Sequence, residues 1–111
     1  MRKLSTGKRR GLQQLANNKG IMAMCALDHR GSLKEMLSGD NSQEVSCQTM
    51  VDFKLDLCRI LGSQASAILL DPIYGAAQAI TAGVLSKSTG LLVSLEESEL
   101  PLWCPIGTYT R

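Results

Sequence analysis

The sequence is poor in aromatic residues and lacks the local patterns that mark metal and nucleotide sites. Phe, Tyr and Trp make up only 4% of the 111 residues, so the core must be built from Leu, Ile, Val, Ala and Met. The four cysteines are nowhere spaced as Cys-x-x-Cys, and a single histidine is present, which argues against a structural zinc site. A Gly-rich nucleotide loop and a Gly-x-Ser-x-Gly elbow are also absent. We therefore expect neither a metal ion nor a cofactor.

The sequence also lacks a long hydrophobic run. The first apolar run begins at Ile21 and lasts about seven residues, which is too short to cross a membrane, and no small-residue cleavage pattern lies near it. Cys25 falls in a predicted strand and Cys58 in a predicted helix, as is typical of buried free thiols. We expect a cytoplasmic protein without disulfides.

Charge of one sign is not in excess, since the net charge is only +2. The one basic cluster lies in the first ten residues and consists of Arg2, Lys3, Lys8, Arg9 and Arg10. It has no interleaved aromatic residues, so a solvated helix face explains it better than contact with nucleic acid. We expect no nucleic-acid partner and no membrane partner.

Three short apolar runs are present, and each stops abruptly at charged residues. They cover residues 21–27, 65–70 and 90–95, and runs of this length predict strands buried on both faces. Helices are predicted at about residues 6–17, 32–37, 43–61 and 76–82. This alternation predicts an α/β fold of parallel strands joined by right-handed crossovers.

Residues that stop or start helices support these boundaries. Gly20, Gly62 and Gly83 each follow a predicted helix, where glycine commonly ends one. Residues 32–35 (Ser-Leu-Lys-Glu) and 41–44 (Asn-Ser-Gln-Glu) both fit a capping box, which would begin the second and third helices.

The ends of the predicted strands carry the residues that are able to perform chemistry. Asp28, His29 and Arg30 follow the first strand, and Asp71 follows the second. Parallel α/β folds keep their sites at this edge, so the sequence predicts one shared site. There Asp28 could orient a substrate hydroxyl or move a proton, His29 offers an imidazole, and Arg30 could bind a carboxylate or phosphate.

Each of these residues also has a purely structural interpretation. Asp28 could open a turn in which Arg30 pairs with it or with the helix beyond, and Asp71 precedes Pro72 in a common turn opener. Glu96 and Glu97, which follow the third strand, are typical of solvated loop carboxylates. The stretch at residues 86–89 could bind phosphate, although a surface loop explains it more simply.

Four segments resemble the tagatose 1,6-bisphosphate aldolase family, a group that includes sulfofructose-phosphate aldolases. They are Ala-Leu-Asp-His-Arg-Gly-Ser-Leu-Lys at residues 26–34, Phe-Lys-Leu-Asp at 53–56, Ala-Ile-Leu-Leu-Asp-Pro-Ile-Tyr-Gly at 67–75, and Thr-Gly-Leu-Leu-Val at 89–93. The resemblance runs from about residue 8 to residue 97. It implies a partial (β/α)8 barrel, with residues 1–97 forming about the first three β/α units and residues 98–111 a divergent irregular tail.

The resemblance also implies roles for the strand-end residues. Asp28 and His29 fall where the first strand of the family touches substrate, although many members have Gln at the second position. With Arg30 they would bind the substrate, while Asp28 and Asp71 would act as catalytic residues in supporting roles. The family forms a Schiff base through a lysine on a later strand. No lysine of this chain is expected at a strand end, and those considered are Lys3, Lys8, Lys19, Lys34, Lys54 and Lys87.

The implied function is that of a class I aldolase fragment. The parent enzyme would cleave a ketose (bis)phosphate such as tagatose 1,6-bisphosphate to triose phosphates, and the fragment alone would be inactive for want of the lysine. Its open sheet edges predict poor stability and self-association. The alternative is a non-catalytic chain that binds a sugar phosphate, or a complementing half that pairs with a separate carboxyl-terminal chain.

Overall fold

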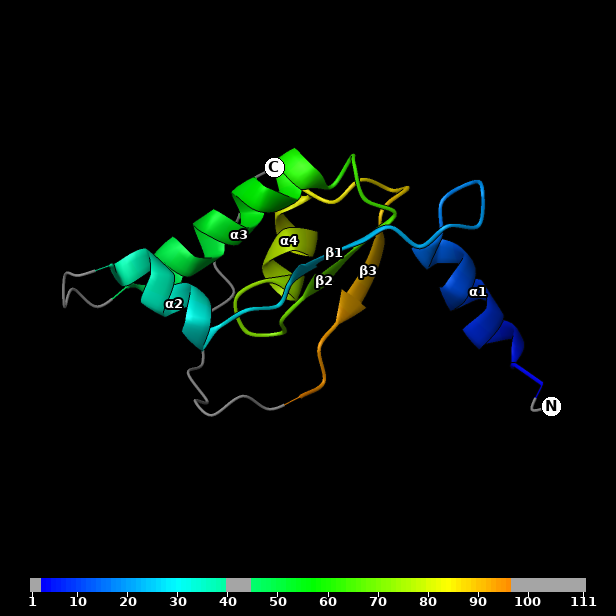
Figure 1. The fold of residues 1–111 in the computed structure, drawn as a ribbon, viewed down its shortest axis with the longest axis horizontal. Coiled ribbons are helices and arrows are strands. Elements are labelled where there is room, and N and C mark those ends of the chain that lie inside the picture. Colours follow the sequence, from blue (N-terminus) through cyan, green and yellow to red (C-terminus); the bar gives the residue numbers. More distant parts are fainter. Residues whose placement is uncertain (1–2, 40–44, 97–111) are drawn as a thin grey trace.

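A three-stranded parallel sheet forms the centre of the computed structural model, which describes residues 3–39 and 45–96. The strands are β1 (Met24–Leu27), β2 (Ala67–Leu70) and β3 (Gly90–Val93), and they lie in the order β1-β2-β3. Both neighbouring pairs are parallel. The predicted α/β class and the parallel pairing are therefore confirmed (Figure 1).

Helices connect the strands because a parallel pair needs a long crossover. α2 (Gly31–Ser38) and α3 (Cys47–Leu61) lie between β1 and β2 in the chain, and α4 (Ala76–Ala82) lies between β2 and β3. α3 and α4 contact each other. They pack on the sheet through a shared hydrophobic core, whose members include Met50, Val51, Leu55, Cys58, Ile68, Leu70 and Ala79.

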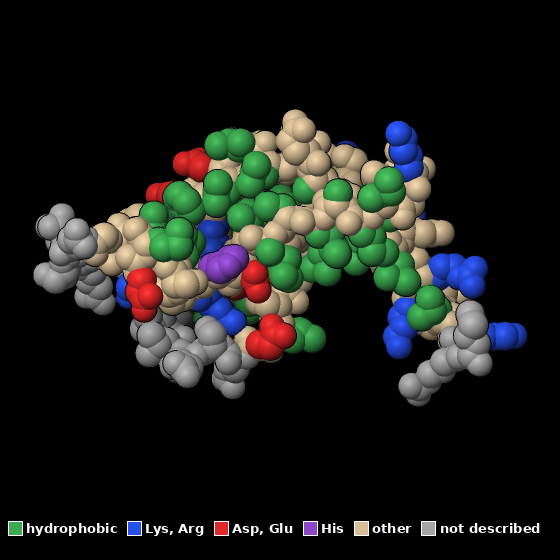
Figure 2. Space-filling view, in the orientation of Figure 1, with side chains coloured by type: hydrophobic (Ala, Val, Ile, Leu, Met, Phe, Trp, Pro, Cys, Tyr) green, Lys and Arg blue, Asp and Glu red, His purple; other side chains and the backbone are tan. Residues whose placement is uncertain are grey.

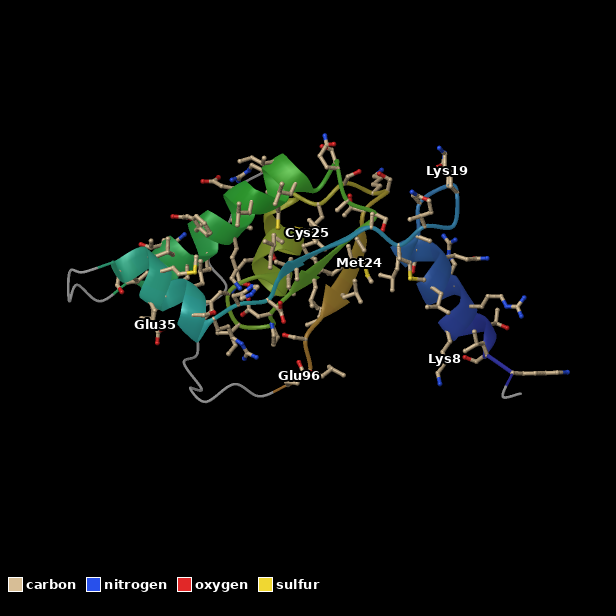
Figure 3. All side chains as sticks on the ribbon, in the orientation of Figure 1. Lys8, Lys19, Met24, Cys25, Glu35 and Glu96 are labelled. Atoms are coloured by element: carbon tan, nitrogen blue, oxygen red, sulfur yellow. The ribbon has the colours of Figure 1, made fainter. Side chains whose placement is uncertain are left out.

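The two faces of the sheet differ in burial. The central strand β2 is buried along most of its length, whereas β1 alternates between exposed and half-buried residues. Met24 is 49% exposed, and in Figure 3 it points away from α3 while Cys25 points toward it. Burial on both faces was expected and is correct for β2 but wrong for β1 and β3. Among the described elements, α3 and α4 cover only one face, and β1 and β3 are its edges.

The helix ends follow the sequence only in part. Gly20 and Gly83 have φ of 75° and 65°, the left-handed conformation that favours glycine, and Gly62 ends α3 as predicted. The capping box at residues 32–35 is wrong, because α2 begins at Gly31 without a side-chain cap. α3 begins later than predicted, where the Ser46 hydroxyl accepts a 3.1 Å hydrogen bond from the Thr49 amide. The second predicted box lies outside the described residues.

The first helix, α1 (Thr6–Leu15), stands apart from the rest of the molecule (Figure 1). None of its residues is buried. Its carboxyl end is held by Ser66, whose hydroxyl donates to the Leu15 carbonyl at 2.7 Å and accepts from the Ala23 amide at 2.8 Å. Gly90 also lies so close to Gln14 that a side chain at position 90 would overlap its carbonyl. The helix is therefore attached at the amino edge of the sheet and projects beyond it.

The cysteines do not all behave as expected. Cys25 and Cys58 are free, and burial raises the pKa of the Cys58 thiol to about 11. Cys47, however, is disulfide-bonded, so the expectation of a chain without disulfides is wrong at this position.

Candidate functional site

The strand register places three polar residues at one level of the carboxyl edge. Leu27 pairs with Leu70, and Leu70 pairs with Val93. The next residue along each strand is Asp28, Asp71 or Ser94, and the Ser94 amide donates a 3.0 Å hydrogen bond to the Leu70 carbonyl. The structure thus brings the predicted residues of the first two strands to the same edge. Figure 2 shows acidic, basic and histidine side chains gathered at this end of the molecule.

A buried ion pair lies directly beneath this edge. The Lys54 ammonium comes from α3, is 1% exposed, and forms an ion pair with Oδ1 of Asp71, which is fully buried. The same ammonium donates a 2.9 Å hydrogen bond to the Leu27 carbonyl at the end of β1. The other Asp71 oxygen, Oδ2, accepts from the amides of Ile73 at 3.0 Å and Tyr74 at 2.7 Å. Both carboxylate oxygens of Asp71 are therefore already occupied by the protein.

Burial and charge act in opposite directions on this pair. Desolvation lowers the pKa of Lys54, while the hydrogen bond and the negative charge of Asp71 oppose that change. The charge of Asp28 also favours the protonated ammonium, so Asp28 lies within electrostatic reach of it. Burial, and then the charge of Asp71, raises the pKa of the Tyr74 hydroxyl.

Arg30 connects the first strand end to the third. Its Nη2 donates a 2.7 Å hydrogen bond to the carbonyl of Glu96, which lies past the end of β3 (Figure 3). The turn in which Arg30 pairs with Asp28 is not formed, because the guanidinium bonds this carbonyl and makes no ion pair with Asp28. Asp28 and Arg30 are half-buried, and His29 is exposed.

A cavity of about 310 Å³ lies beside His29. Its lining is mostly apolar and comes from β1, α2 and α3, with Leu33, Met36 and Phe53 among its residues. A larger hollow of about 720 Å³ lies at the opposite edge of the sheet, between α1 and β3. The smaller cavity is next to His29, whereas the larger hollow is lined in part by residues 87–89, for which a surface loop was the simpler explanation.

Two residues at the carboxyl edge were missed by sequence reasoning. The expectation that no lysine lies at a strand end is wrong for Lys54, whose ammonium reaches the ends of β1 and β2. The available signal was its place among the buried α3 residues Met50, Val51, Leu55 and Cys58. A charge on such a stripe needs a buried partner. The second residue is Ser94, which is 8% exposed and whose hydroxyl has no hydrogen-bond partner in the described structure. Its place at the carboxyl edge follows only from the strand register.

The remaining expectations concern loops, metals and membranes. The serines at 86 and 88 bond each other in an exposed turn, as a surface loop would. Glu96 is exposed, and Glu97 and the predicted tail at residues 98–111 lie outside the described residues. Within residues 3–39 and 45–96, no group of three or more His, Cys, Asp or Glu side chains is placed to hold a metal ion. No helix in the same ranges is long and apolar enough to cross a membrane.

Comparison with known proteins connects the chain to one group of enzymes. It is 40% identical over 98 residues to tagatose 1,6-diphosphate aldolase 1 of Enterococcus faecalis. These residues make up 88% of this chain and 29% of that protein. It is 42% identical over 98 residues to the tagatose 1,6-diphosphate aldolase of Listeria monocytogenes, and 34% identical over 94 residues to that of Staphylococcus aureus. No family model matches.

Because 98 of the 111 residues are matched, the matched region includes the ends of β1 and β2 and the helix α3, which carries Lys54. The chain spans less than a third of the length of the relatives it matches. It fits an amino-terminal portion of them, in agreement with the resemblance found in residues 26–34 and 67–75. Over about 88% of its length, the chain is thus homologous to the amino-terminal part of proteins named tagatose 1,6-diphosphate aldolase.

Proposed function

We propose that this chain forms the first three β/α units of a class I aldolase barrel. With the rest of the barrel present, the enzyme would cleave a ketose bisphosphate such as tagatose 1,6-bisphosphate to triose phosphates. The observation that carries the proposal is the carboxyl edge of the sheet, where residues after all three parallel strands meet. Barrel enzymes place their catalytic residues at this edge, and the relatives are named as aldolases of this substrate.

Each residue at the edge has a proposed role. Arg30 is suited to a phosphate group, because only one of its nitrogens is bonded to the Glu96 carbonyl and a guanidinium offers five donors. Asp28 is half-buried, and we assign it to orienting a substrate hydroxyl or moving a proton. His29 is exposed beside the cavity and would contact the substrate. Asp71 acts in a supporting role.

The Schiff-base lysine is proposed to lie on a later strand of the barrel. Such a lysine must be neutral when it attacks the ketose carbonyl, and the carbonyl must be able to reach it. Lys54 is unsuited, because its ammonium is 1% exposed and paired with Asp71. For this reason we propose that the chain alone does not cleave the sugar. A cytoplasmic location stays a prediction.

The open edges of the sheet favour a related function, that of a complementing half. In the described sheet, β1 and β3 each pair only with β2. Exposed hydrophobic side chains such as Met24 and Val93 lie on these edge strands. Figure 2 shows a band of hydrophobic side chains along the hollow beside α1. Barrel closure would pair such edges and cover such a face, so the missing strands would come from further chain or from a separate polypeptide.

Reconstitution tests the proposal. The full chain is co-expressed with the part of the Enterococcus faecalis relative that follows its matched region, giving what we call the reconstituted complex. Release of triose phosphate from tagatose 1,6-bisphosphate is measured for the chain alone and for the complex. Borohydride is added with substrate to trap a Schiff base.

We expect no cleavage by the chain alone, and we expect cleavage by the complex that borohydride abolishes. Cleavage by the chain alone would show that the essential lysine is inside it, contrary to the proposal. Copurification without cleavage would instead favour the non-catalytic, sugar-phosphate-binding alternative. Failure of the two polypeptides to associate would contradict the complementing half.

A further inference from the structure

We infer that Lys54 is a positioning residue, which holds Asp28 in place by tying the ends of β1 and β2 together. This inference rests on the proposed aldolase function and adds to it a residue from the outer helix layer. Lys54 does not contact the open edge itself, because its side chain is 1% exposed. It would act through the backbone that carries Asp28.

The tie consists of two contacts of the Lys54 ammonium, one with the Leu27 carbonyl and one with the Asp71 carboxylate. The first of them is the contact with the Leu27 carbonyl oxygen. The Lys54 ammonium donates to this oxygen at 2.9 Å. The same peptide group joins Leu27 to Asp28, and a peptide group is rigid and planar. Fixing the carbonyl oxygen therefore fixes the direction in which the chain enters Asp28.

The other end of the tie is equally well anchored. Asp71 Oδ1 pairs with the ammonium, while Oδ2 accepts hydrogen bonds from the amides of Ile73 and Tyr74. Gly75 packs against this carboxylate, since a Cβ at position 75 would lie 3.1 Å from Oδ1. The loop after β2 is thus wrapped around Asp71, and Lys54 holds the end of β1 to that loop.

Asp28 and Arg30 depend on this tie to different degrees. Arg30 has a separate attachment through its 2.7 Å hydrogen bond to the Glu96 carbonyl. No hydrogen bond or ion pair joins the Asp28 carboxylate to another residue of the described ranges, so its position depends on its backbone. Loss of the tie should therefore displace the group that moves protons more than the group that binds phosphate. The kinetic consequence is a fall in kcat with little change in KM.

The test uses a variant that leaves no charge buried without a partner. Lys54→Met combined with Asp71→Asn removes both charges, and the Asn oxygen can still accept from the amides of Ile73 and Tyr74. Lys54→Arg keeps the positive charge and is the conservative variant. Lys19→Met is the matched control, because Lys19 lies in an exposed loop near α1, far from the carboxyl edge (Figure 3).

Two readouts are made. The ¹⁵N relaxation order parameters of the backbone amides of residues 28–30 are measured in the full chain. In the reconstituted complex, kcat and KM are measured per borohydride-trapped site. In the double variant we expect the order parameters of residues 28–30 to fall from about 0.85, typical of rigid backbone, toward about 0.6. We expect kcat to fall about 10- to 100-fold with KM within about twofold, as for a displaced catalytic group. Lys54→Arg should retain more of kcat than the double variant, and Lys19→Met should change neither readout.

Unchanged order parameters at residues 28–30 in the double variant would overturn the inference, whatever the activity. A wild-type kcat per trapped site in the double variant would also overturn it. A rise in KM as large as the fall in kcat would do the same. Lower order parameters together with an inactive wild-type complex would contradict the proposed function but would still support the positioning role of Lys54. The two failures are therefore distinguishable.

Discussion

The two ends of the parallel sheet are held by different kinds of contact. At the carboxyl edge, the charged Lys54 and Asp71 join two strand ends from inside the core. At the amino edge, the neutral hydroxyl of Ser66 holds α1 through the Leu15 carbonyl, and no residue of α1 is buried. A buried ion pair is stabilising only when both charges are present, whereas a neutral hydrogen bond contributes little on its own. The difference indicates where precise placement matters in this fold: at the edge that carries Asp28 and Arg30.

Breaking the carboxyl-edge contact from one side should have the largest effect. Lys54→Met leaves the fully buried Asp71 carboxylate without its cation. We expect a loss of about 3–5 kcal/mol in the free energy of unfolding. Chemical denaturation of the full chain measures it, with Lys19→Met as the exposed control. A loss below about 1 kcal/mol, the range of an exposed pair, would contradict the account of the carboxyl edge.

The core between the two edges can be tested by pH. Burial raises the pKa of the Cys58 thiol from 9.0 to about 11, so the folded state holds this proton more tightly than the unfolded state. The resulting stability is fully present below pH 9.0 and is lost as the pH rises toward about 11. The loss should reach about 2–3 kcal/mol at the upper end. Urea denaturation of wild type and Cys58→Ala across this pH range measures the loss. An identical pH dependence of the free energy of unfolding in both proteins would contradict burial of the Cys58 thiol.

Crowding the carboxyl edge should have a moderate effect. A Cβ at Gly75 would lie 3.1 Å from the Asp71 carboxylate and 3.1 Å from the Leu70 side chain. We expect Gly75→Ala to lower the free energy of unfolding by about 1–3 kcal/mol. Gly11→Ala in α1 is the matched control, because nothing lies within 4 Å of its added Cβ. The control should be stabilised by up to about 1 kcal/mol. An equal change in the free energy of unfolding at positions 75 and 11 would contradict close packing of Gly75 against Asp71.

Weakening the amino edge should have the smallest effect. Ser66→Ala removes the hydrogen bonds to the Leu15 carbonyl and from the Ala23 amide. We expect a loss of about 1–2 kcal/mol and faster proteolysis within α1. Circular dichroism during denaturation and limited proteolysis measure these changes. A destabilisation as large as that of Lys54→Met would make the two edges equivalent.

The sequence predicted the elements better than the contacts between them. The bounds of α4 and the glycines that end α3 and α4 follow from local preferences, and they are where they were expected. The capping box at the start of α2 failed because Arg30 precedes the helix with φ −120° and ψ −82°, outside the extended region that a capping residue adopts. The local sequence pattern is thus sufficient to predict that a helix forms here, but not to predict how its first turn is capped.

The tie at the carboxyl edge lay beyond local reasoning for a different reason. Lys54 is 27 residues from Leu27 and 17 from Asp71 along the chain, so only the packing of α3 on the sheet brings them together. Asp28 and Arg30 were recognisable because they follow an apolar run directly. The exposed face of β1 was not, because an apolar run looks the same whether or not further chain covers it.

The most direct test of the account is the effect of Asp28→Asn on the reconstituted complex. The account predicts that kcat for cleavage of tagatose 1,6-bisphosphate falls about 10²- to 10⁴-fold, as expected for loss of a group that moves a proton. Glu35→Gln, on the exposed surface of α2, should leave kcat unchanged (Figure 3). Wild-type kcat in the Asp28→Asn complex would contradict the claim that this edge of the sheet carries the aldolase site.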